Sequence, residues 1–502
     1  MRFANRPRRY LSAMREISSP LAGFASPFGP QRGFNPLRLF ANDEPGVWFE
    51  ANDANTLFTD VAGTTPVTAP GDAVALQLDK SQGLTLGPDT VDFAVLGDQG
   101  TGWVKEDGII KKISDDATLY DFGASVEAGK YYEITLTKLN HTVGNPSITV
   151  GGNSYSGIIS FEDPDGTYTF ILQATGSGTV TVAANAARIW LSAFSVRELP
   201  GNHRTQATTA ARPLYALHPV GGVRNELVST DTLATQDVTV TAAQRTLSFK
   251  GTGTVTLSGA STAGPLVGTG AEDIVSLTFT PTAGTLTLTV TGTVEEAQLE
   301  LGAARTNYQT VGSTFLDVSE EGKARRGRIW YNGTSHFMQT GTITPGTDKV
   351  QVFAGVRKLR NNAQEAVLEL NNFAEAGLSV QTLATFAPWR FGSRGDAAPS
   401  IADAASSTFP SPVSSIITGL GDISGDSAIL RVDGVEIAES TADQGLGNYA
   451  NSVLRFGARA GISLFFNGYE DTSIIRFGPN LDASVIGKVE SYVASKTPEA
   501  TI

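Results

Sequence analysis

The sequence predicts an all-β protein of tandem antiparallel β-sandwiches, with an extended N-terminal arm and one C-terminal helix. Its 502 residues are enough for three or four domains of about 100–200 residues each. Glycine occurs 54 times and charged residues make up only 17% of the chain, against an ordinary share of about 25%. Short segments of alternating apolar and polar residues recur between turn-forming clusters, which is typical of sandwiches.

The composition also excludes several kinds of chemistry. The chain has no cysteine, so a disulfide framework, a zinc–cysteine site and a thiol catalyst are all impossible. The four histidines are far apart in sequence, which argues against a histidine-rich catalytic or metal site. The four are His141, His203, His218 and His336. No run of about 18 apolar residues is present, so we expect no membrane insertion.

Residues 1–40 predict a basic arm that docks on an acidic partner. They hold seven arginines and one acid, a charge of +6, which leaves −19 for the other 462 residues. Phenylalanines recur every four to six residues among prolines and glycines, as expected of anchors that become ordered on a partner. A floppy terminus and a cleaved transit peptide are the alternatives. The candidate docking residues are Arg2, Arg6, Arg8, Arg9, Arg15, Phe24, Phe28 and Phe34.

The acidic body and the early sequence limit the other partners. A body of charge −19 repels nucleic acid and anionic membranes, so we expect neither as a partner. No apolar segment of 7–15 residues follows the first arginines, so we expect no secretory signal peptide. We therefore expect the protein to be made in a cytoplasm.

The body divides into five segments after the arm. Residues 41–95 alternate short apolar pieces with turn clusters and predict an irregular connector. Residues 96–198 contain evenly spaced strand patterns and predict a first sandwich module. Residues 199–228 are rich in Pro, Gly, Arg and Asn and predict a linker. Residues 229–311 are rich in threonine and alternate with period two, which predicts a second sandwich of the same kind.

Residues 312–502 are long enough for one larger sandwich. Asp433-Gly434 lies between two alternating segments, which is a strong signal for a two-residue hairpin. Residues 482–496 predict a helix at the margin of this sandwich. Asp482 is its expected N-cap, and its apolar face is formed by Val485, Val489, Tyr492 and Val493.

Several segments resemble structural proteins of tailed bacteriophages and prophage-like particles. The last 190 residues resemble a concanavalin A-like, laminin-G type jelly roll, with the hairpin RVDGV and a terminal YVASKT. The segment SVRELPGNHRTQAT (Ser195–Thr208) resembles a recurring junction of such proteins, and Gly46–Pro88 resembles a connector near their start. The segment AQLELGAARTNYQTV (Ala297–Val311) resembles the closing strand of carbohydrate-binding-type sandwiches in phage fibres.

The resemblance implies a fibre, tail-tip or head spike on the virion surface, made in the host cytoplasm and often assembled as a homotrimer. On this interpretation residues 1–40 contact other virion proteins and the sandwiches recognise a host-surface polysaccharide. Two alternatives stay open at this stage. The chain is either an internal tail or baseplate scaffold that contacts only virion proteins, or a polysaccharide depolymerase.

The depolymerase alternative has little support in the sequence, and we expect no enzyme. Glycoside hydrolysis needs two carboxylates on one cleft, about 5–9.5 Å apart. The nearest acidic strands carry Glu365 with Glu369, and Glu296 with Glu300. Each pair is four residues apart with no acid between its members, so solvent-facing strand acids explain them better. No Walker loop, dinucleotide fingerprint or HExxH motif occurs.

We expect no cofactor, although two acidic turns leave calcium open. One is Glu162–Gly166 and the other contains Asp422 and Asp426. A calcium site needs six or more oxygen ligands, and neither turn has EF-hand spacing. Ordinary turn acids are therefore the default interpretation.

Sugar recognition calls for an exposed aromatic platform beside hydrogen-bonding groups. Trp389 follows a proline and precedes Arg390, which predicts a loop setting and makes it the preferred platform. Simple packing is the alternative. Trp330 and Tyr331 lie on opposite faces of one strand, so one of them is expected to be exposed. Asn371, Asn372 and Arg394 offer polar contacts, but nothing in the sequence places them beside Trp389.

Overall fold

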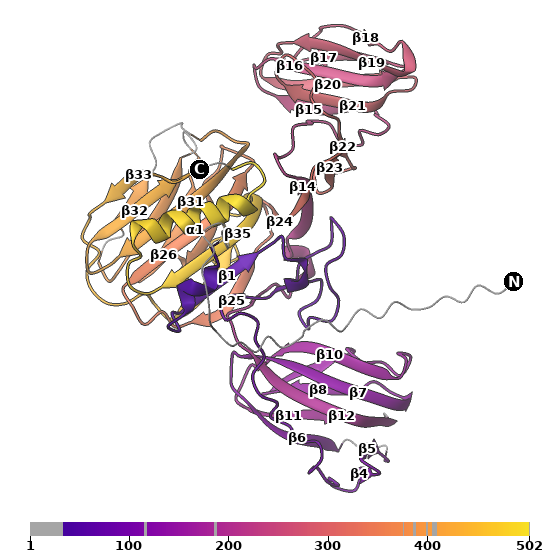
Figure 1. The fold of residues 1–502 in the computed structure, drawn as a ribbon, viewed down its shortest axis with the longest axis vertical. Coiled ribbons are helices and arrows are strands. Elements are labelled where there is room, and N and C mark those ends of the chain that lie inside the picture. Colours follow the sequence, from indigo (N-terminus) through magenta and orange to yellow (C-terminus); the bar gives the residue numbers. More distant parts are fainter. Residues whose placement is uncertain are drawn as a thin grey trace, which may run out of the picture. The chain divides into compact units, whose positions relative to one another are not determined.

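Antiparallel strand ladders account for nearly all of the regular structure (Figure 1). The computed structural model describes residues 34–114, 118–184, 188–374, 376–384, 388–397, 400–403 and 409–500. Across these residues the chain forms one large sandwich, two smaller ones and a single α-helix, which confirms the predicted fold class. None of the helices described is long and apolar enough to cross a membrane.

The large sandwich is the jelly roll, made of an eight-stranded and a nine-stranded sheet. The eight-stranded sheet contains β1 (Gly46–Glu50), β14 (Leu214–Pro219), β24 (Arg325–Asn332), β26 (Lys349–Lys358), β31 (Val413–Asp422), β32 (Ser427–Val432), β33 (Val435–Ser440) and β35 (Asn467–Phe477). The nine-stranded sheet contains β2 (Leu57–Phe58), β3 (Leu76–Gln77), β13 (Arg204–Thr205), β25 (Met338–Ile343), β34 (Ser452–Phe456), β27 (Glu365–Leu370), β28 (Leu378–Thr382), β29 (Trp389–Ser393) and β30 (Ser400–Asp403).

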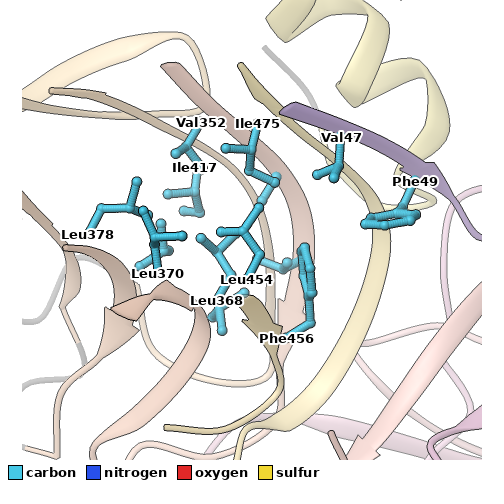
Figure 2. Close-up of a cluster of buried hydrophobic side chains, with 14 of the residues drawn as sticks. Val47, Phe49, Val352, Leu368, Leu370, Leu378, Ile417, Leu454, Phe456 and Ile475 are labelled. Carbon is cyan, nitrogen blue, oxygen red and sulfur yellow. The ribbon is translucent and has the colours of Figure 1, made fainter. Parts of the chain in front are cut away.

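The core of the jelly roll lies between these two sheets. Figure 2 shows Val352, Ile417 and Ile475 of the eight-stranded sheet facing Leu368 and Leu454 of the nine-stranded one. All five side chains are fully buried. Because side chains alternate between the two faces along a strand, the residues next to these core residues on each strand lie on the outer faces of the two sheets.

The jelly roll extends beyond the expected residues 312–502. Strands β1, β2, β3, β13 and β14 all come from segments that the sequence predicts as connector or linker. Gly46 pairs with Arg476 and Glu50 pairs with Thr472, so β1 forms an antiparallel ladder with the C-terminal part of β35. Val47 and Phe49 enter the core, which explains why these residues fold with distant partners.

The two smaller sandwiches are insertions in the jelly roll, the first between β3 and β13 and the second between β14 and β24. The first has a five-stranded sheet of β4 (Trp103–Glu106), β5 (Ile109–Lys112), β7 (Tyr131–Val143), β10 (Gly166–Gln173) and β12 (Arg188–Leu199). Its second sheet contains β6 (Leu119–Val126), β8 (Ser147–Val150), β9 (Asn153–Ser156) and β11 (Gly178–Ala183). The two ends of this module meet, because the amide of Gly87 donates to the carbonyl of Glu198 at 2.8 Å.

The threonine-rich module also has two facing sheets. They consist of β15 (Gln236–Val240), β17 (Thr254–Gly259), β18 (Leu266–Val267) and β20 (Gly284–Thr291), and of β16 (Arg245–Gly251), β19 (Gly270–Phe279) and β21 (Glu295–Leu301). A two-stranded ladder of β22 (Gln309–Val311) and β23 (Val318–Glu320) follows it. The amide of Ser229 donates to the carbonyl of Gly312 at 2.7 Å, so the ends of this module also meet.

Helix α1 (Ala483–Lys496) lies across the outer face of the eight-stranded sheet, over β26, β31 and β35 (Figure 1). Its N-cap is Asp482, as expected, although the Asp482 side chain makes no capping hydrogen bond. Ile486, Val489 and Val493 are its buried apolar residues. The helix therefore covers one outer face of the jelly roll.

The predicted hairpin at Asp433-Gly434 is confirmed. Val432 pairs with Val435, and both turn residues have positive φ angles of 50° and 79°. These angles match the type I′ geometry that two-residue hairpins prefer, and an Asp-Gly pair tolerates them well.

The junction motif Ser195–Thr208 fastens the first module to the jelly roll. The carboxylate of Asp79 is buried and accepts the amides of Trp48 at 2.7 Å and Asn202 at 2.8 Å. The Nδ1 atom of His203 accepts the amide of Asp79 at 2.8 Å. Arg204, the next residue, enters the jelly-roll core. These contacts give a structural reason for the sequence Asn-His-Arg at this point.

The last residues of the predicted arm, Pro36–Phe40, pack on the jelly roll, so the arm is shorter at its C-terminal end than the expected residues 1–40. Pro36–Phe40 form a 3-10 helix in which Leu39 and Phe40 are only 3% and 5% exposed. The carbonyl of Leu39 accepts a hydrogen bond from Nε of Arg476 at 2.7 Å. This segment therefore belongs to the jelly roll.

Candidate ligand-binding face

Trp389 is not an exposed platform, which corrects the expectation from sequence. Its side chain is fully buried in the jelly-roll core, and Nε1 donates to Oγ of Ser415 at 3.3 Å. The reason is that residues 389–393 form a strand rather than a loop. Arg390 is consequently on the outer face of the nine-stranded sheet, where it is half-buried.

Trp330 and Tyr331 lie on the other sheet, so they do not form one site with Arg390. The hydroxyl of Tyr331 is buried and donates to Glu470 at 2.8 Å. Trp330 is half-buried, and its ring packs edge-on against His336 with centroids 5.6 Å apart. Arg394 is half-buried and donates to the carbonyl of Ala397.

Most of the predicted docking residues lie outside the described residues. Phe34 is described and is half-buried. The residues outside are Arg2, Arg6, Arg8, Arg9, Arg15, Phe24 and Phe28.

Both acidic turns that left calcium open already hold a lysine ammonium. Nζ of Lys138 donates to the carbonyls of Ser160 at 3.0 Å and Asp163 at 2.5 Å. Nζ of Lys349 lies 2.8 Å from the carboxylate of Asp422. Among the residues that the structure describes, no group of three or more His, Asp or Glu side chains is placed to hold a metal ion.

The paired glutamates of β27 are buried and engaged in ion pairs, which corrects the expectation that they face solvent. Glu369 is fully buried and accepts from Nε of Arg459 at 3.2 Å and from the amide of Ala460 at 2.7 Å. Glu365 is equally buried and pairs with Arg360. Burial raises the pKa of both carboxyl groups above the ordinary range. This arrangement stabilises the sheet and leaves neither carboxylate directed at an open cleft.

The outer face of the nine-stranded sheet carries a polar row that crosses five strands. Arg455 of β34 pairs with Gln339 of β25 on one side and with Glu369 of β27 on the other. Ser379 of β28 follows Glu369, and Gly392 of β29 follows Ser379. Their sequence neighbours Met338, Leu368, Leu378, Phe391 and Phe456 are all in the core, which fixes the polar row on the outside.

A strained loop folds onto the polar row. Asn371, Asn372 and Phe373 all have left-handed backbones, with φ between 53° and 54°, although none is glycine. Such residues cost free energy, of order 1 kcal/mol or more each, and they gather at functional sites. The ring of Phe373 lies over Gly392, where a Cβ atom would overlap it. Glycine at 392 therefore lets an aromatic ring rest on the sheet.

The loop also orients Arg455. Its Nη1 donates to Oδ1 of Asn372, and its Nε donates to Oε1 of Gln339 at 3.2 Å. Both acceptors are neutral amides. Asn372 is exposed, while Arg455, Gln339 and Phe373 are half-buried, so this part of the polar row is in reach of solvent. The sheet thus presents a fixed guanidinium, amide groups and an aromatic ring together.

A polar cavity of about 390 Å³ adjoins the same strand, β25. Its size falls within the range of about 300–1,000 Å³ that is typical of ligand sites. Lys130 at its wall pairs with Glu127 at 3.1 Å and with Glu198 at 3.2 Å. The cavity is lined by Ala128, Gly129, Lys130, Tyr131, Gly201, Asn202, Gly341 and Thr342.

Sequence reasoning missed Arg455, Phe373 and Gly392. The pair Asn371-Asn372 was a usable signal, because asparagine tolerates left-handed backbone better than most residues. Nothing in the local sequence placed Arg455 next to Asn372, since the two residues are 83 apart.

Comparisons with known proteins give fold-level likenesses only. No protein-family model matches the chain, and no curated protein matches it. Among solved structures, the NanB sialidase from Streptococcus pneumoniae matches with 15% identity over 32% of this chain and 26% of its own length, at a TM-score of 0.26. The chain thus spans about a quarter of that sialidase.

Two further similar structures concern ligand binding. The CBM40 of the Ruminococcus gnavus IT-sialidase, bound to α2,3-sialyllactose, matches with 13% identity over 29% of this chain and 83% of its own, at a TM-score of 0.23. A botulinum neurotoxin type C structure, described as interacting with two gangliosides, matches with 12% identity over 35% of this chain and 41% of its own, at a TM-score of 0.25. Likenesses this weak carry no argument about the ligand of this chain.

Proposed function

We propose that this protein is a structural and adhesion component of a phage or phage-like particle, a tail fibre, tail tip or head spike, that binds host-surface glycans without cleaving them. The basic arm docks on other virion proteins, and the jelly roll binds the polysaccharide. A homotrimeric assembly is part of the proposal, since closed symmetric oligomers are common.

The observation that carries the glycan-binding part is the polar row with its strained loop. Sugar recognition combines an aromatic ring, against which a sugar ring packs, with directional polar groups that bind hydroxyls. The ring of Phe373 on Gly392 and the amides of Gln339 and Asn372 supply both. Gln339 stands on a strand of the packed sandwich, and the strained loop that carries Asn372 and Phe373 rests on the same sheet.

The absence of cleavage is supported by the state of the acids on this face. Glu369 is held by Arg459 and Ala460, and Glu365 is held by Arg360. Hydrolysis needs two carboxylates that are free to act on one glycosidic bond. Engaged, buried glutamates favour binding without chemistry.

Incubation of the purified protein with host capsule tests this function. We expect retention of the protein without release of new reducing ends. Reducing ends would indicate a depolymerase, and absence of retention would favour the internal scaffold. Two variants refine the test: Phe373→Ala and Gly392→Ala should each lower retention about tenfold, because the first removes the ring and the second displaces it.

A matched control separates this effect from loss of folding. Val435 lies on β33 of the other sheet and is 59% exposed, so Val435→Ala should leave retention unchanged. If Gly392→Ala and Val435→Ala retain equally well, the polar row is not the glycan site.

A further inference from the structure

We propose that the glycan bound by the polar row carries carboxylate groups, and that Arg455 is the residue that selects them. This inference rests on the proposed glycan-binding function and adds the chemical class of the ligand. Uronic and other sugar acids are the source of carboxylates in polysaccharides. Sulfated and phosphorylated glycans offer a related anion and are separate outcomes of the test.

Arg455 has no carboxylate partner in the part of the chain that the structure describes. Its hydrogen bonds go to Oε1 of Gln339 and Oδ1 of Asn372, both neutral. The nearby Glu369 forms its ion pair with Arg459, and the charge of Arg455 acts on it without a direct hydrogen bond or ion pair. Several other buried or half-buried arginines of the jelly roll pair with acids, namely Arg204, Arg328, Arg431 and Arg476, whereas the Arg394 side chain, among the described residues, bonds only to a backbone carbonyl.

The amide partners orient the guanidinium without neutralising it. A guanidinium has five N–H donors, and these two bonds occupy two of them. The planar fork of the remaining donors matches a carboxylate, and such charge-assisted bonds are about twice as strong as neutral ones. A carboxylate bound there would also supply a directly bonded counter-charge, which a neutral sugar cannot do.

Local charge favours the same ligand. Two arginines, Arg455 and Arg459, stand beside the single carboxylate of Glu369, whereas the chain outside residues 1–40 carries −19. The remainder of the body therefore repels a polyanion, and this position attracts one. The strained backbone at Asn372 is consistent with this role, because it is what brings Oδ1 to Arg455.

An array of bacterial polysaccharides tests the inference, with each polysaccharide spotted before and after chemical reduction of its carboxylates to alcohols. The full-length wild type should bind a subset of native spots and lose about tenfold to a hundredfold in affinity after reduction. Arg455→Gln should bind the native spots as weakly as the wild type binds the reduced ones, with no further loss on reduction. Arg455→Lys should keep part of the preference, because it retains the charge and loses the fork.

Two more variants separate selection from folding. Asn372→Gly removes the orienting Oδ1 but accepts the left-handed backbone, so it should reduce the preference for carboxylates without lowering the melting temperature. Arg325→Gln removes a partly exposed arginine that pairs with Asp317, and should leave the preference unchanged. Because carboxyl reduction changes only the ligand, the wild type tests the inference even if Arg455→Gln is unstable.

Each contrary result has a distinct meaning. Binding that survives carboxyl reduction, or a preference that Arg455→Gln retains, overturns the inference and leaves the proposed function intact. Binding confined to sulfated or phosphorylated spots replaces the carboxylate with another anion and also overturns it. Absence of binding to every polysaccharide overturns the proposed function and the inference together.

Discussion

The guanidinium of Arg204 lies 2.9 Å from the carboxylate of Glu470, inside the jelly roll. The two side chains are 1% and 3% exposed. The Arg204 guanidinium also lies 4.4 Å from the ring centroids of both Phe49 and Phe456, which pack edge to face against each other. Because Arg204 belongs to the junction motif and Glu470 to β35, this buried pair ties the end of the first module to the main sandwich.

Replacing Arg204 by methionine should destabilise the jelly roll by about 3–5 kcal/mol, because it leaves Glu470 buried without a counter-charge. The double variant Arg204→Met with Glu470→Leu should recover much of that loss. Urea unfolding followed by tryptophan fluorescence measures both. Arg325→Met breaks a more exposed pair with Asp317 and should cost less than about 1 kcal/mol. Equal losses for Arg204→Met and Arg325→Met would contradict the assignment.

Trp389 and Arg390 are adjacent residues with opposite expected behaviour. Trp389→Ala removes a fully buried side chain and should lower the free energy of unfolding by about 3–5 kcal/mol. Arg390→Ala on the outer face should cost less than about 1 kcal/mol. Thermal melts of the two variants measure the difference. A stable Trp389→Ala variant would mean that the tryptophan is not a core residue.

Trp389 also shows where prediction from sequence stops. Alternation within β29 puts Trp389 and Arg390 on opposite faces, but the face that turns inward depends on pairing with β28 and β30. Features that depend only on neighbouring residues could be predicted from the sequence, as the hairpin at Asp433-Gly434 was. The β-rich class was predictable for the same reason.

Contacts between distant segments were not predictable. Val47 and Phe49 look like part of a connector until β35, more than 400 residues later, provides their partner strand. The candidate site has the same character, since Arg455 and Asn372 meet only through the pairing of β27 with β34. A single sequence carries no signal for such pairings.

The threonine-rich module should be removable. The amide of Val311 donates to the hydroxyl of Thr230 at 2.8 Å, so the chain leaves and returns at one place. Replacing residues 231–308 by two glycines, with Leu227→Ser to remove an apolar side chain from the module core, should leave the jelly roll folded. Calorimetry should then show the jelly-roll transition within a few degrees of its original temperature. Loss of that transition would show that the module is part of the main fold.

Glu499 predicts a pH dependence near the C-terminus. Burial acts to raise its pKa, but the charges of Arg328 and Arg357 prevail and hold the pKa at about 2, below the ordinary 4.5. An acid with a lowered pKa in the folded state stabilises the fold above its unfolded pKa, and that stabilisation is lost as the pH falls from about 4.5 toward 2. The full effect is about 3 kcal/mol.

The comparison of wild type with Glu499→Gln isolates this effect, because burial raises the pKa of Asp471, which shares Arg328, and would confuse a single curve. The wild type should be more stable near pH 6, and the gap should close between pH 4.5 and 2. Urea midpoints across this range measure the gap. A gap that is constant with pH would contradict the assigned ion pairs.

The extent of the arm decides how its docking role can be tested. Deleting residues 1–40 also removes Leu39 and Phe40, which are buried, and the carbonyl that Arg476 binds. Burial of two such side chains is worth about 3–6 kcal/mol, so this deletion should destabilise the jelly roll. Deleting residues 1–33 stops before the 3-10 helix Pro36–Phe40 and should leave the melting temperature unchanged. Under the proposed function, the shorter deletion should still abolish incorporation into particles, because it removes six of the seven arginines of the arm. Incorporation of the shorter deletion at the wild-type level, measured on purified particles, would show that the arm is not the docking segment.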